Sequence, residues 1–243
     1  MSFSGHIKLP QLKMHEITDP IDRDRNIGCK RLDLSDYNEV VEFMFKTYSF
    51  SEPVSLALSP TLQEVNEVLE LGTKSCLESN TSIAAYDNNS GELIAVVLSE
   101  FNQLDSIDLN SFGEYGRKMF QIVVDLNRQG LPDHIRRSKF LTLVAGSVRP
   151  EYSKQGVTTK LAERSKLVAM EFGCEYITVE CTSLYSQAVC RKLGYTLLHE
   201  IKYLDYSDEA TGEKWYASIR EPHRSIQLFA LKVKRPLNIS PRL

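Results

Sequence analysis

Between residues 141 and 195 the spacing of apolar positions changes from one segment to the next. The apolar runs at 141–148 and 176–181 are typical of strands buried in a sheet. The first run leads through a polar loop at 150–155 to Gly156. Positions spaced for one helix face follow at Val157, Leu161, Val168 and Phe172, and a second helix is expected over 185–193. The pattern therefore predicts a strand–helix–strand–helix unit.

The N-terminal half carries shorter predicted elements. A strand is expected over 27–33, followed by a helix from Ser35. Its apolar face is predicted at Tyr37, Val41, Met44 and Tyr48. A second helix is expected with Ser59 as N-cap and Pro60 as its first residue. Its apolar positions are Leu62, Val65, Val68 and Leu69.

Turn residues divide the rest of the chain. Strands at 81–86 and 92–98 flank Asn88-Asn89-Ser90-Gly91, which predicts a hairpin. A helix is expected over 111–127, and late strands over 200–206 and 225–233. The polar residues 1–26 lack periodicity and are interpreted as a tail or arm. We expect one domain over 27–234 and a solvated tail over 235–243.

Composition limits the function classes. The chain has 243 residues, 42% of them hydrophobic and 25% charged, with a net charge of −3. This balance favours a globular protein and argues against nucleic acid or an anionic membrane as partner. We expect no membrane span or secretory signal, because no long apolar run is present. Five cysteines without metal-ligand spacing favour free thiols, no metal and a cytoplasmic location.

The loop at 150–156 joins a predicted strand to a helix that begins beside a glycine. The first N–H groups of a helix lack intrahelical partners and attract anions, so the loop is suited to a pyrophosphate. An ordinary turn with glycine in a tight bend fits the same residues, because short glycine motifs are weak signals. The loop alone leaves both interpretations open.

Several segments together resemble the GNAT superfamily of N-acetyltransferases, and within it the insect and nematode arylalkylamine (dopamine and serotonin) type. The matching segments are Ser147-Val148, Tyr152, Gly156-Val157-Thr158, Cys181–Ser186 and Lys192–Tyr195, with weaker matches at Phe50–Pro53 and Ile226–Ala230. The resemblance spans roughly residues 27–234. It implies an α/β fold: a mixed, mainly antiparallel sheet with helices on both faces, splayed at the strand that holds pantetheine.

The resemblance also implies where acetyl-CoA binds as cosubstrate. The backbone of Gly146, Ser147 and Val148 is expected to pair with the pantetheine arm. The pyrophosphate is expected to face Lys154, Gln155, Gly156, Val157, Thr158 and Thr159. Two positions depart from the family pattern, which has Gln or Arg at Ser153 and a small residue at Thr158. Backbone N–H groups still supply the cradle.

Acetyl transfer to an amine needs a base and a proton donor. An ammonium group near pKa 10 is mostly protonated at neutral pH, so a base must deprotonate it. Glu52 matches the catalytic glutamate of the family, and Pro53 is expected to push it out of helical geometry into a loop. Ser186 is the expected proton donor to the CoA thiolate, with Thr182 as a second catalytic hydroxyl. Cys190 lies one helical turn from Ser186 and is interpreted as buried filler.

A small-molecule amine is the expected partner, and an arylalkyl amine needs an apolar, aromatic-lined slot. The candidate lining residues are Tyr48, Phe50, Phe101, Phe112, Tyr115 and Phe120. The predicted function is N-acetylation of a small aromatic amine by direct attack in a ternary complex. The alternatives are another amine, such as a polyamine or a peptide N-terminus, and an acyl-CoA-binding module without turnover. The sequence does not indicate an oligomeric state.

Overall fold

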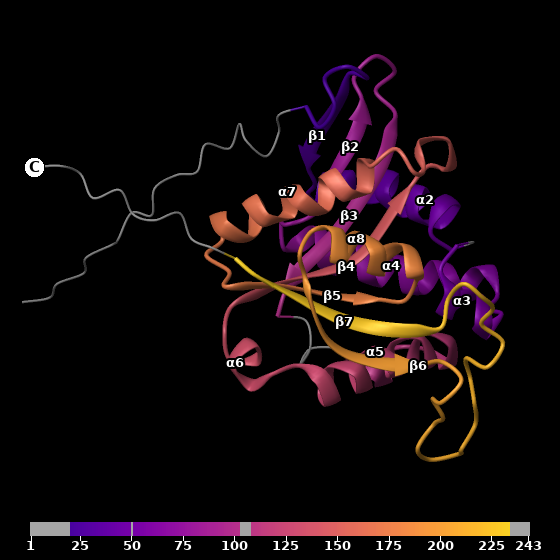
Figure 1. The fold of residues 1–243 in the computed structure, drawn as a ribbon. Coiled ribbons are helices and arrows are strands. Elements are labelled where there is room, and N and C mark those ends of the chain that lie inside the picture. Colours follow the sequence, from indigo (N-terminus) through magenta and orange to yellow (C-terminus); the bar gives the residue numbers. More distant parts are fainter. Residues whose placement is uncertain (1–19, 50, 103–107, 234–243) are drawn as a thin grey trace, which may run out of the picture.

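A computed structural model describes residues 20–49, 51–102 and 108–233 (Figure 1). Its described strands form one sheet of order β1-β2-β3-β4-β5-β7-β6. They are β1 (Ile27–Arg31), β2 (Ile83–Asp87), β3 (Leu93–Phe101), β4 (Phe140–Val148), β5 (Tyr176–Cys181), β6 (Thr196–Lys202) and β7 (Ser225–Lys232). β4 and β5 are parallel and the other neighbours are antiparallel. The expected mixed, mainly antiparallel sheet is confirmed.

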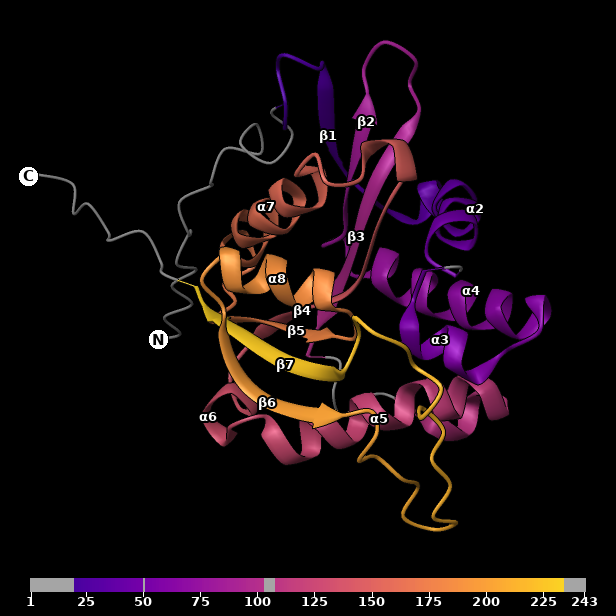
Figure 2. The ribbon, with the colours of Figure 1, turned by 45° about the vertical axis from the view of Figure 1, so that its right-hand side comes forward.

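Helices cover both faces of the sheet, as expected (Figures 1 and 2). The α-helices are α2 (Tyr37–Thr47), α3 (Pro53–Leu58), α4 (Leu62–Glu78), α5 (Glu114–Gly130), α6 (Asp133–Arg136), α7 (Val157–Glu171) and α8 (Leu184–Lys192), with short 3-10 turns η1 (Leu34–Asp36), η3 (Leu109–Ser111) and η4 (Pro150–Tyr152). α7 and α8 pack on one face, and α2, α4 and α5 on the other. None of the helices in the described ranges is long and apolar enough to cross a membrane.

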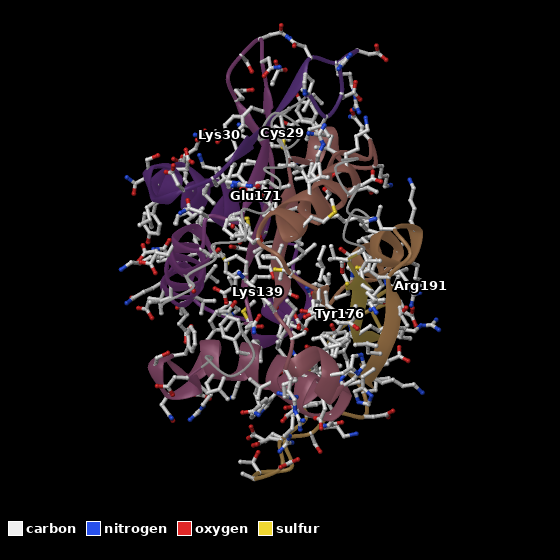
Figure 3. All side chains as sticks on the ribbon, turned by 90° about the vertical axis from the view of Figure 1, so that its left-hand side faces the viewer. Cys29, Lys30, Lys139, Glu171, Tyr176 and Arg191 are labelled. Carbon is white, nitrogen blue, oxygen red and sulfur yellow. The ribbon has the colours of Figure 1, made fainter. Side chains whose placement is uncertain are left out.

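Alternating side chains give each face its own core. Along β2, Ile83 and Ala85 pack with α7 residues such as Leu161, whereas Ala84 packs with Met44 of α2. Successive residues of a strand point to opposite faces, so a strand apolar at every position serves both cores. Glu171, at the end of α7 (Figure 3), also accepts hydrogen bonds of 3.0 and 2.5 Å from Arg31 of β1.

β4 and β5 separate partway along their length, and this opening positions the site. Their pairing runs from Phe140↔Tyr176 to Leu143↔Val179 and then stops. Beyond it, β4 follows β3 while β5 follows β7. An irregularity between Leu98 and Ser99 in the β3–β4 pairing turns β4 at the same level. The expected splay is therefore present between the C-terminal halves of the two strands.

The start of α4 differs from the sequence prediction. Ser59 is not its N-cap: with φ of +50° it ends the unpredicted helix α3. Thr61 caps α4 instead, because its hydroxyl accepts the Glu64 N–H (3.3 Å) while the Glu64 carboxylate accepts the Thr61 N–H (2.9 Å). This reciprocal pair is a capping box, and it places the start of α4 after Thr61 and not at the Ser59-Pro60 pair.

Two further predictions were shifted. Met44 of the predicted α2 stripe is buried, and Tyr37 and Tyr48 are half-buried against the same core. Val40 and Phe43 complete the buried face where Val41 was expected, because neighbouring stripes of a helix share one period. β6 begins at Thr196 and ends at Lys202, earlier than the predicted 200–206. As an exposed edge strand it lacks the apolar signal that marks buried strands.

Candidate active site

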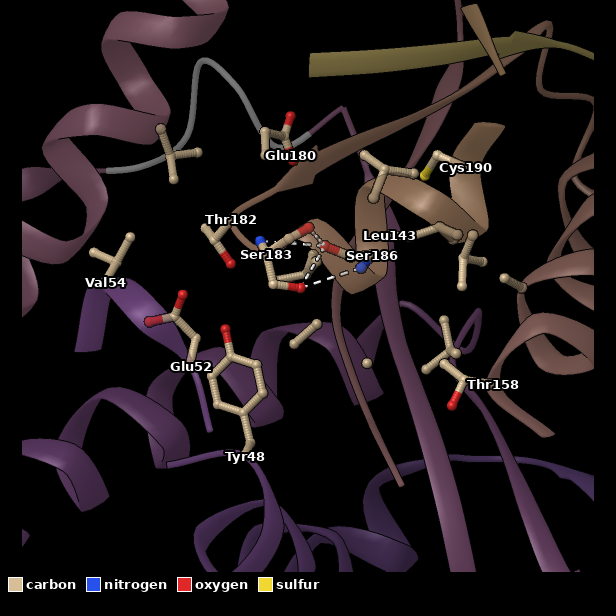
Figure 4. A pocket seen from close by; sticks show the side chains of 18 of the residues that line it. Tyr48, Glu52, Val54, Leu143, Thr158, Glu180, Thr182, Ser183, Ser186 and Cys190 are labelled. Carbon is tan, nitrogen blue, oxygen red and sulfur yellow. Dashed lines mark hydrogen bonds between the residues drawn. The ribbon is translucent and has the colours of Figure 1, made fainter. Parts of the chain in front are cut away.

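A cavity of about 220 Å³ lies where β4 and β5 separate, and residues from both faces of the sheet line it (Figure 4). Gly146, Thr158 and Cys190 line the side of α7 and α8. Glu52 and Phe120 line the side of α3 and α5. The sheet opening thus joins a space beside the predicted phosphate loop to a space beside the predicted base.

Gly156 gives the loop before α7 its shape. Its φ of +79° lies in the left-handed region, and it occupies the N-cap position without a side-chain cap. The N–H groups in the first turn of α7 are therefore left without a capping side chain, as an anion-binding helix start requires. Lys154 and Gln155 are exposed, Thr159 is half-buried, and Val157 is buried in the core behind the loop.

The three predicted pantetheine residues on β4 face different ways. Arg149 N–H donates to the Ile94 carbonyl (2.9 Å), which fixes the register of the β3–β4 ladder. Backbone groups alternate in direction along an antiparallel strand, so those of Gly146 and Val148 face the opening. Ser147 faces β3 with its backbone, and its hydroxyl donates to Thr47 Oγ1 (2.7 Å) on α2.

Residues 20–26, from the predicted tail or arm, contact the phosphate loop. Arg25 Nη2 donates to the Gln155 carbonyl (3.1 Å), and Nη1 bonds the Gln155 side chain. Asp22 pairs with Arg25 (2.7 Å) and with Lys160 (3.0 Å) on α7. The Arg25 and Lys160 bonds hold the pKa of Asp22 far below its usual range. The arm therefore places a guanidinium beside the loop in which Ser153 stands where the resemblance led us to expect Arg or Gln.

Glu52 is the N-cap of α3, in extended backbone geometry as Pro53 led us to expect. Its Oε2 accepts the Ser55 N–H, and its Oε1 is buried without a partner in the described part of the chain. The side chain is buried. Burial raises the pKa of Glu52, and the hydrogen bond from the Ser55 N–H opposes this shift.

Tyrosines surround this carboxylate. Tyr48 lines the cavity beside Glu52 (Figure 4). Tyr115 shares a hydrogen bond of 2.8 Å with the Ser55 hydroxyl. Tyr203 donates to the Thr182 carbonyl (2.6 Å) and so fixes the chain just after β5. These rings exclude water from Glu52, and the sequence pattern did not indicate Tyr203.

Ser186 and Cys190 both line the cavity from α8, one turn apart, as expected. Ser186 also belongs to a capping box: its N–H donates to Ser183 Oγ (3.1 Å) and its hydroxyl accepts the Ser183 N–H (3.4 Å). The Ser186 hydroxyl in turn donates to the Ser183 carbonyl (3.0 Å). Cys190 is buried with its Sγ 3.4 Å from that of Cys181. Thr182 lines the cavity at the end of β5.

The predicted aromatic slot is only partly correct. Tyr48 and Phe120 line the cavity. Phe101 instead packs on Phe172, with ring centroids 5.1 Å apart, and Phe112 lines a second cavity of about 370 Å³ together with Tyr115. Phe50 lies outside the described residues. Aliphatic residues complete the wall in their place: Val54, Met119 and Val123.

Sequence reasoning missed one carboxylate of the cavity, Glu180. It accepts a hydrogen bond from Asn127 Nδ2 (3.0 Å) on α5, and burial raises its pKa to about 7. A charged residue inside the apolar run 176–181 was the available signal, because unpaired charges are rarely buried without a function. No cluster of His, Cys, Asp or Glu in the described ranges is arranged to hold a metal ion.

The fold is similar to those of solved N-acetyltransferases, whereas no family model matches the chain. Arylalkylamine N-acetyltransferase 2 from Aedes aegypti aligns with a TM-score of 0.75 and 25% identity, over 86% of this chain and 100% of the other. An agmatine N-acetyltransferase aligns with a TM-score of 0.70 and 21% identity, over 85% and 99%. The Drosophila melanogaster polyamine N-acetyltransferase aligns with a TM-score of 0.66 and 21% identity, over 85% and 99%.

Proposed function

We propose that this chain, whose fold is similar to those of GNAT-fold N-acetyltransferases, transfers the acetyl group of acetyl-CoA to the nitrogen of a small arylalkyl amine. The observation that carries this proposal is the cavity at the β4–β5 opening. A buried carboxylate, Glu52, and a hydroxyl, Ser186, line the same cavity from opposite sides of the sheet. Direct transfer in a ternary complex needs such a passage between donor and acceptor.

The cofactor side would be held mainly by backbone groups. The helix start after Gly156 would bind the pyrophosphate, aided by Arg25 and Lys160. The free backbone groups of Gly146 and Val148 would pair with the pantetheine amides and direct the thioester into the opening. The Thr158 methyl lies beside this stretch, 3.7 Å from where a Cβ on Gly146 would be.

The proposed reaction places one proton transfer on the acceptor side of the cavity and one on the cofactor side. Glu52 accepts a proton from the ammonium, and the free amine attacks the thioester carbonyl to form the C–N bond. The tetrahedral intermediate collapses and the C–S bond breaks. Ser186, with Thr182 nearby, relays a proton to the leaving thiolate and is reprotonated by the proton that the attacking nitrogen loses, so the hydroxyl ends unchanged. The N–H group in the first turn of α8 and the helix field favour the negative charge that develops there.

The shape of the acceptor side supports an aromatic amine. Tyr48, Phe120, Val54, Met119 and Val123 offer ring-sized apolar walls. A polyamine is the second candidate, because Glu180 adds a second carboxylate to the cavity. The Aedes protein is titled an arylalkylamine enzyme and the Drosophila protein a polyamine enzyme, so relatives with this fold include both.

One assay tests these assignments together. The protein is mixed with acetyl-CoA and a thiol-reactive dye, and released CoA is followed with tryptamine, phenethylamine or spermidine. We expect kcat/KM for the two aromatic amines to exceed that for spermidine between pH 7 and 9. A higher value for spermidine would assign the chain to polyamines. CoA binding in calorimetry without turnover of any amine would make it a non-catalytic binding module.

We also propose that the protein works in the cytoplasm on this small molecule, without nucleic acid or membrane as partner. All five cysteines are free and buried in the structure, which suits a reducing compartment. The net charge of −3 argues against nucleic acid or an anionic membrane as partner.

Ser186→Ala should lower kcat by about 10- to 100-fold, whereas Cys190→Ala should leave it nearly unchanged. A CoA thiolate is a good leaving group, so its proton donor contributes at or below the low end of general-acid effects. Both variants remove a small group from the same face of α8, and circular dichroism would check that the capping box still holds the helix. A large loss for Cys190→Ala with none for Ser186→Ala would reverse the assignment.

A further inference from the structure

Glu180 is a second carboxylate in the cavity, and the proposed acetyl transfer does not use it (Figure 4). Glu180 is the next to last residue of β5, and Thr182 follows the end of this strand two positions later. Two residues of extended chain span about 7 Å. Thr182 lines the same cavity as Glu52 and its hydroxyl points toward the Glu52 carboxylate in Figure 4, so Glu180 lies on the acceptor wall beyond Thr182.

The environment of Glu180 supplies a neutral donor but no cation. Asn127 Nδ2 donates to its Oε1 (3.0 Å) and also to the Val123 carbonyl (3.0 Å), which fixes the amide. No lysine, arginine or histidine of the described ranges forms an ion pair with it. Glu100 on the same side of the sheet is a like charge that adds to the effect of burial on the Glu180 pKa.

Glu180 is half-buried, and its charged form has one neutral hydrogen-bond donor beside it but no cation in the described ranges. A carboxylate withdrawn from water costs free energy unless its charge is paired, so an apolar wall seldom holds one without a use. With a pKa of about 7, Glu180 is partly ionised at neutral pH, and a bound donor would favour the ionised form. The apolar residues Phe120 and Val123 line the same cavity.

We propose that Glu180 determines acceptor specificity by accepting a hydrogen bond from a donor group at the far end of the amine. This inference rests on the proposed function. The nitrogen would lie at Glu52 and the ring between Phe120 and Val123. A ring hydroxyl, or a second cationic nitrogen, would then reach Glu180, because the separation from Thr182 matches the length of an arylalkyl amine. Acceptors without that donor would leave the carboxylate unsatisfied.

The test compares acceptors that differ only in the donor. We expect the wild-type kcat/KM for tyramine to exceed that for phenethylamine by about 10-fold or more, the scale of a hydrogen bond to a charged group. Glu180→Ala should lower the tyramine value by about 10- to 100-fold and change the phenethylamine value little. Equal losses for both amines, or no loss for either, would overturn the proposal.

A second variant distinguishes a hydroxyl donor on the amine from a cationic one. It also keeps a side chain of similar size, so that a loss of activity does not simply reflect misfolding. Glu180→Gln keeps an oxygen for Asn127 and for a hydroxyl donor, but removes the charge. If the natural donor is a hydroxyl, this variant should retain part of the tyramine preference. If it is a cation, the variant should lose most activity with agmatine or putrescine while tyramine changes less. An unchanged preference in both variants would exclude Glu180 as the specificity residue.

A matched control uses the carboxylate Glu200 on β6, which does not line the cavity. Glu200→Gln should preserve the ratio of tyramine to phenethylamine turnover. Failure of the proposed function would appear differently, as no acetylation of any amine by the wild type. In that case calorimetry of tyramine and phenethylamine, with CoA present, still tests Glu180. A donor-dependent affinity lost in Glu180→Ala supports the proposal, and equal affinities overturn it.

Discussion

Glu52→Gln should lower kcat by ~10²–10⁴, the usual effect of removing a positioned general base. Glutamine keeps an oxygen that can accept the Ser55 N–H, so α3 should stay capped. Acetyl-CoA affinity measured by calorimetry should not change, because Glu52 lies on the acceptor side of the sheet. The deficit should shrink at high pH, where free amine is already abundant.

The pH dependence has a definite sign. Burial raises the pKa of Glu52, so the base is protonated, and activity lost, at a higher pH than for an exposed glutamate. Wild-type kcat/KM should fall on the acid side as Glu52 gains its proton, and this limb should be absent in the variant. A Glu64→Gln control removes a glutamate that caps the next helix, α4, and should leave the profile unchanged. A Glu52→Gln profile identical to wild type would rule out the base.

Gly156→Glu should weaken CoA binding by two orders of magnitude or more and abolish turnover at ordinary acetyl-CoA concentrations. The new side chain adds negative charge at the helix start where the pyrophosphate is expected to lie. It also forces a residue with a Cβ into the left-handed region, at a cost of about 1–2 kcal/mol. Calorimetry with CoA measures the first effect and thermal unfolding the second.

A control variant distinguishes the effect of backbone strain from that of the added negative charge. Gly173 has φ of +70° and, like Gly156, open space around an added Cβ, but it follows the C-terminal end of α7. Gly173→Glu should therefore cost similar stability and leave CoA affinity intact. Equal CoA affinity in Gly156→Glu and wild type would mean that the pyrophosphate binds elsewhere.

The β4–α7–β5–α8 unit was predictable because each of its elements is long and strongly patterned. Its strands are apolar at nearly every position, since helices cover both sides, and α7 repeats its apolar face over four turns. Short or exposed elements gave no such signal. α3 has six residues, fewer than two helical turns, and β6 is an exposed edge strand. Local cap chemistry at Thr61 also competed with a plausible Ser-Pro pair.

The candidate site was predictable only where a local motif existed. Glu52 and Ser186 were identified through segments that resemble known relatives, and both line the cavity. Arg25 could not be found this way, because it meets Gln155 across 130 positions of sequence and belongs to no motif. Glu180 is one glutamate in an apolar strand, and only the spatial meeting of β5 with α5 makes it part of the site.

The contact between the arm and the phosphate loop bears on how the domain should be cut for expression. A fragment beginning at residue 27, the boundary suggested by composition, would lack both Asp22 and Arg25. Gln155 would then lose its guanidinium partner, and Lys160 would lose its carboxylate. The core would retain its buried side chains, since none of residues 20–26 is buried, and would lose only the half-buried Ile21 that packs against it. Such a fragment should fold but bind CoA more weakly. Ligand-binding measurements therefore need a fragment that begins before Asp22.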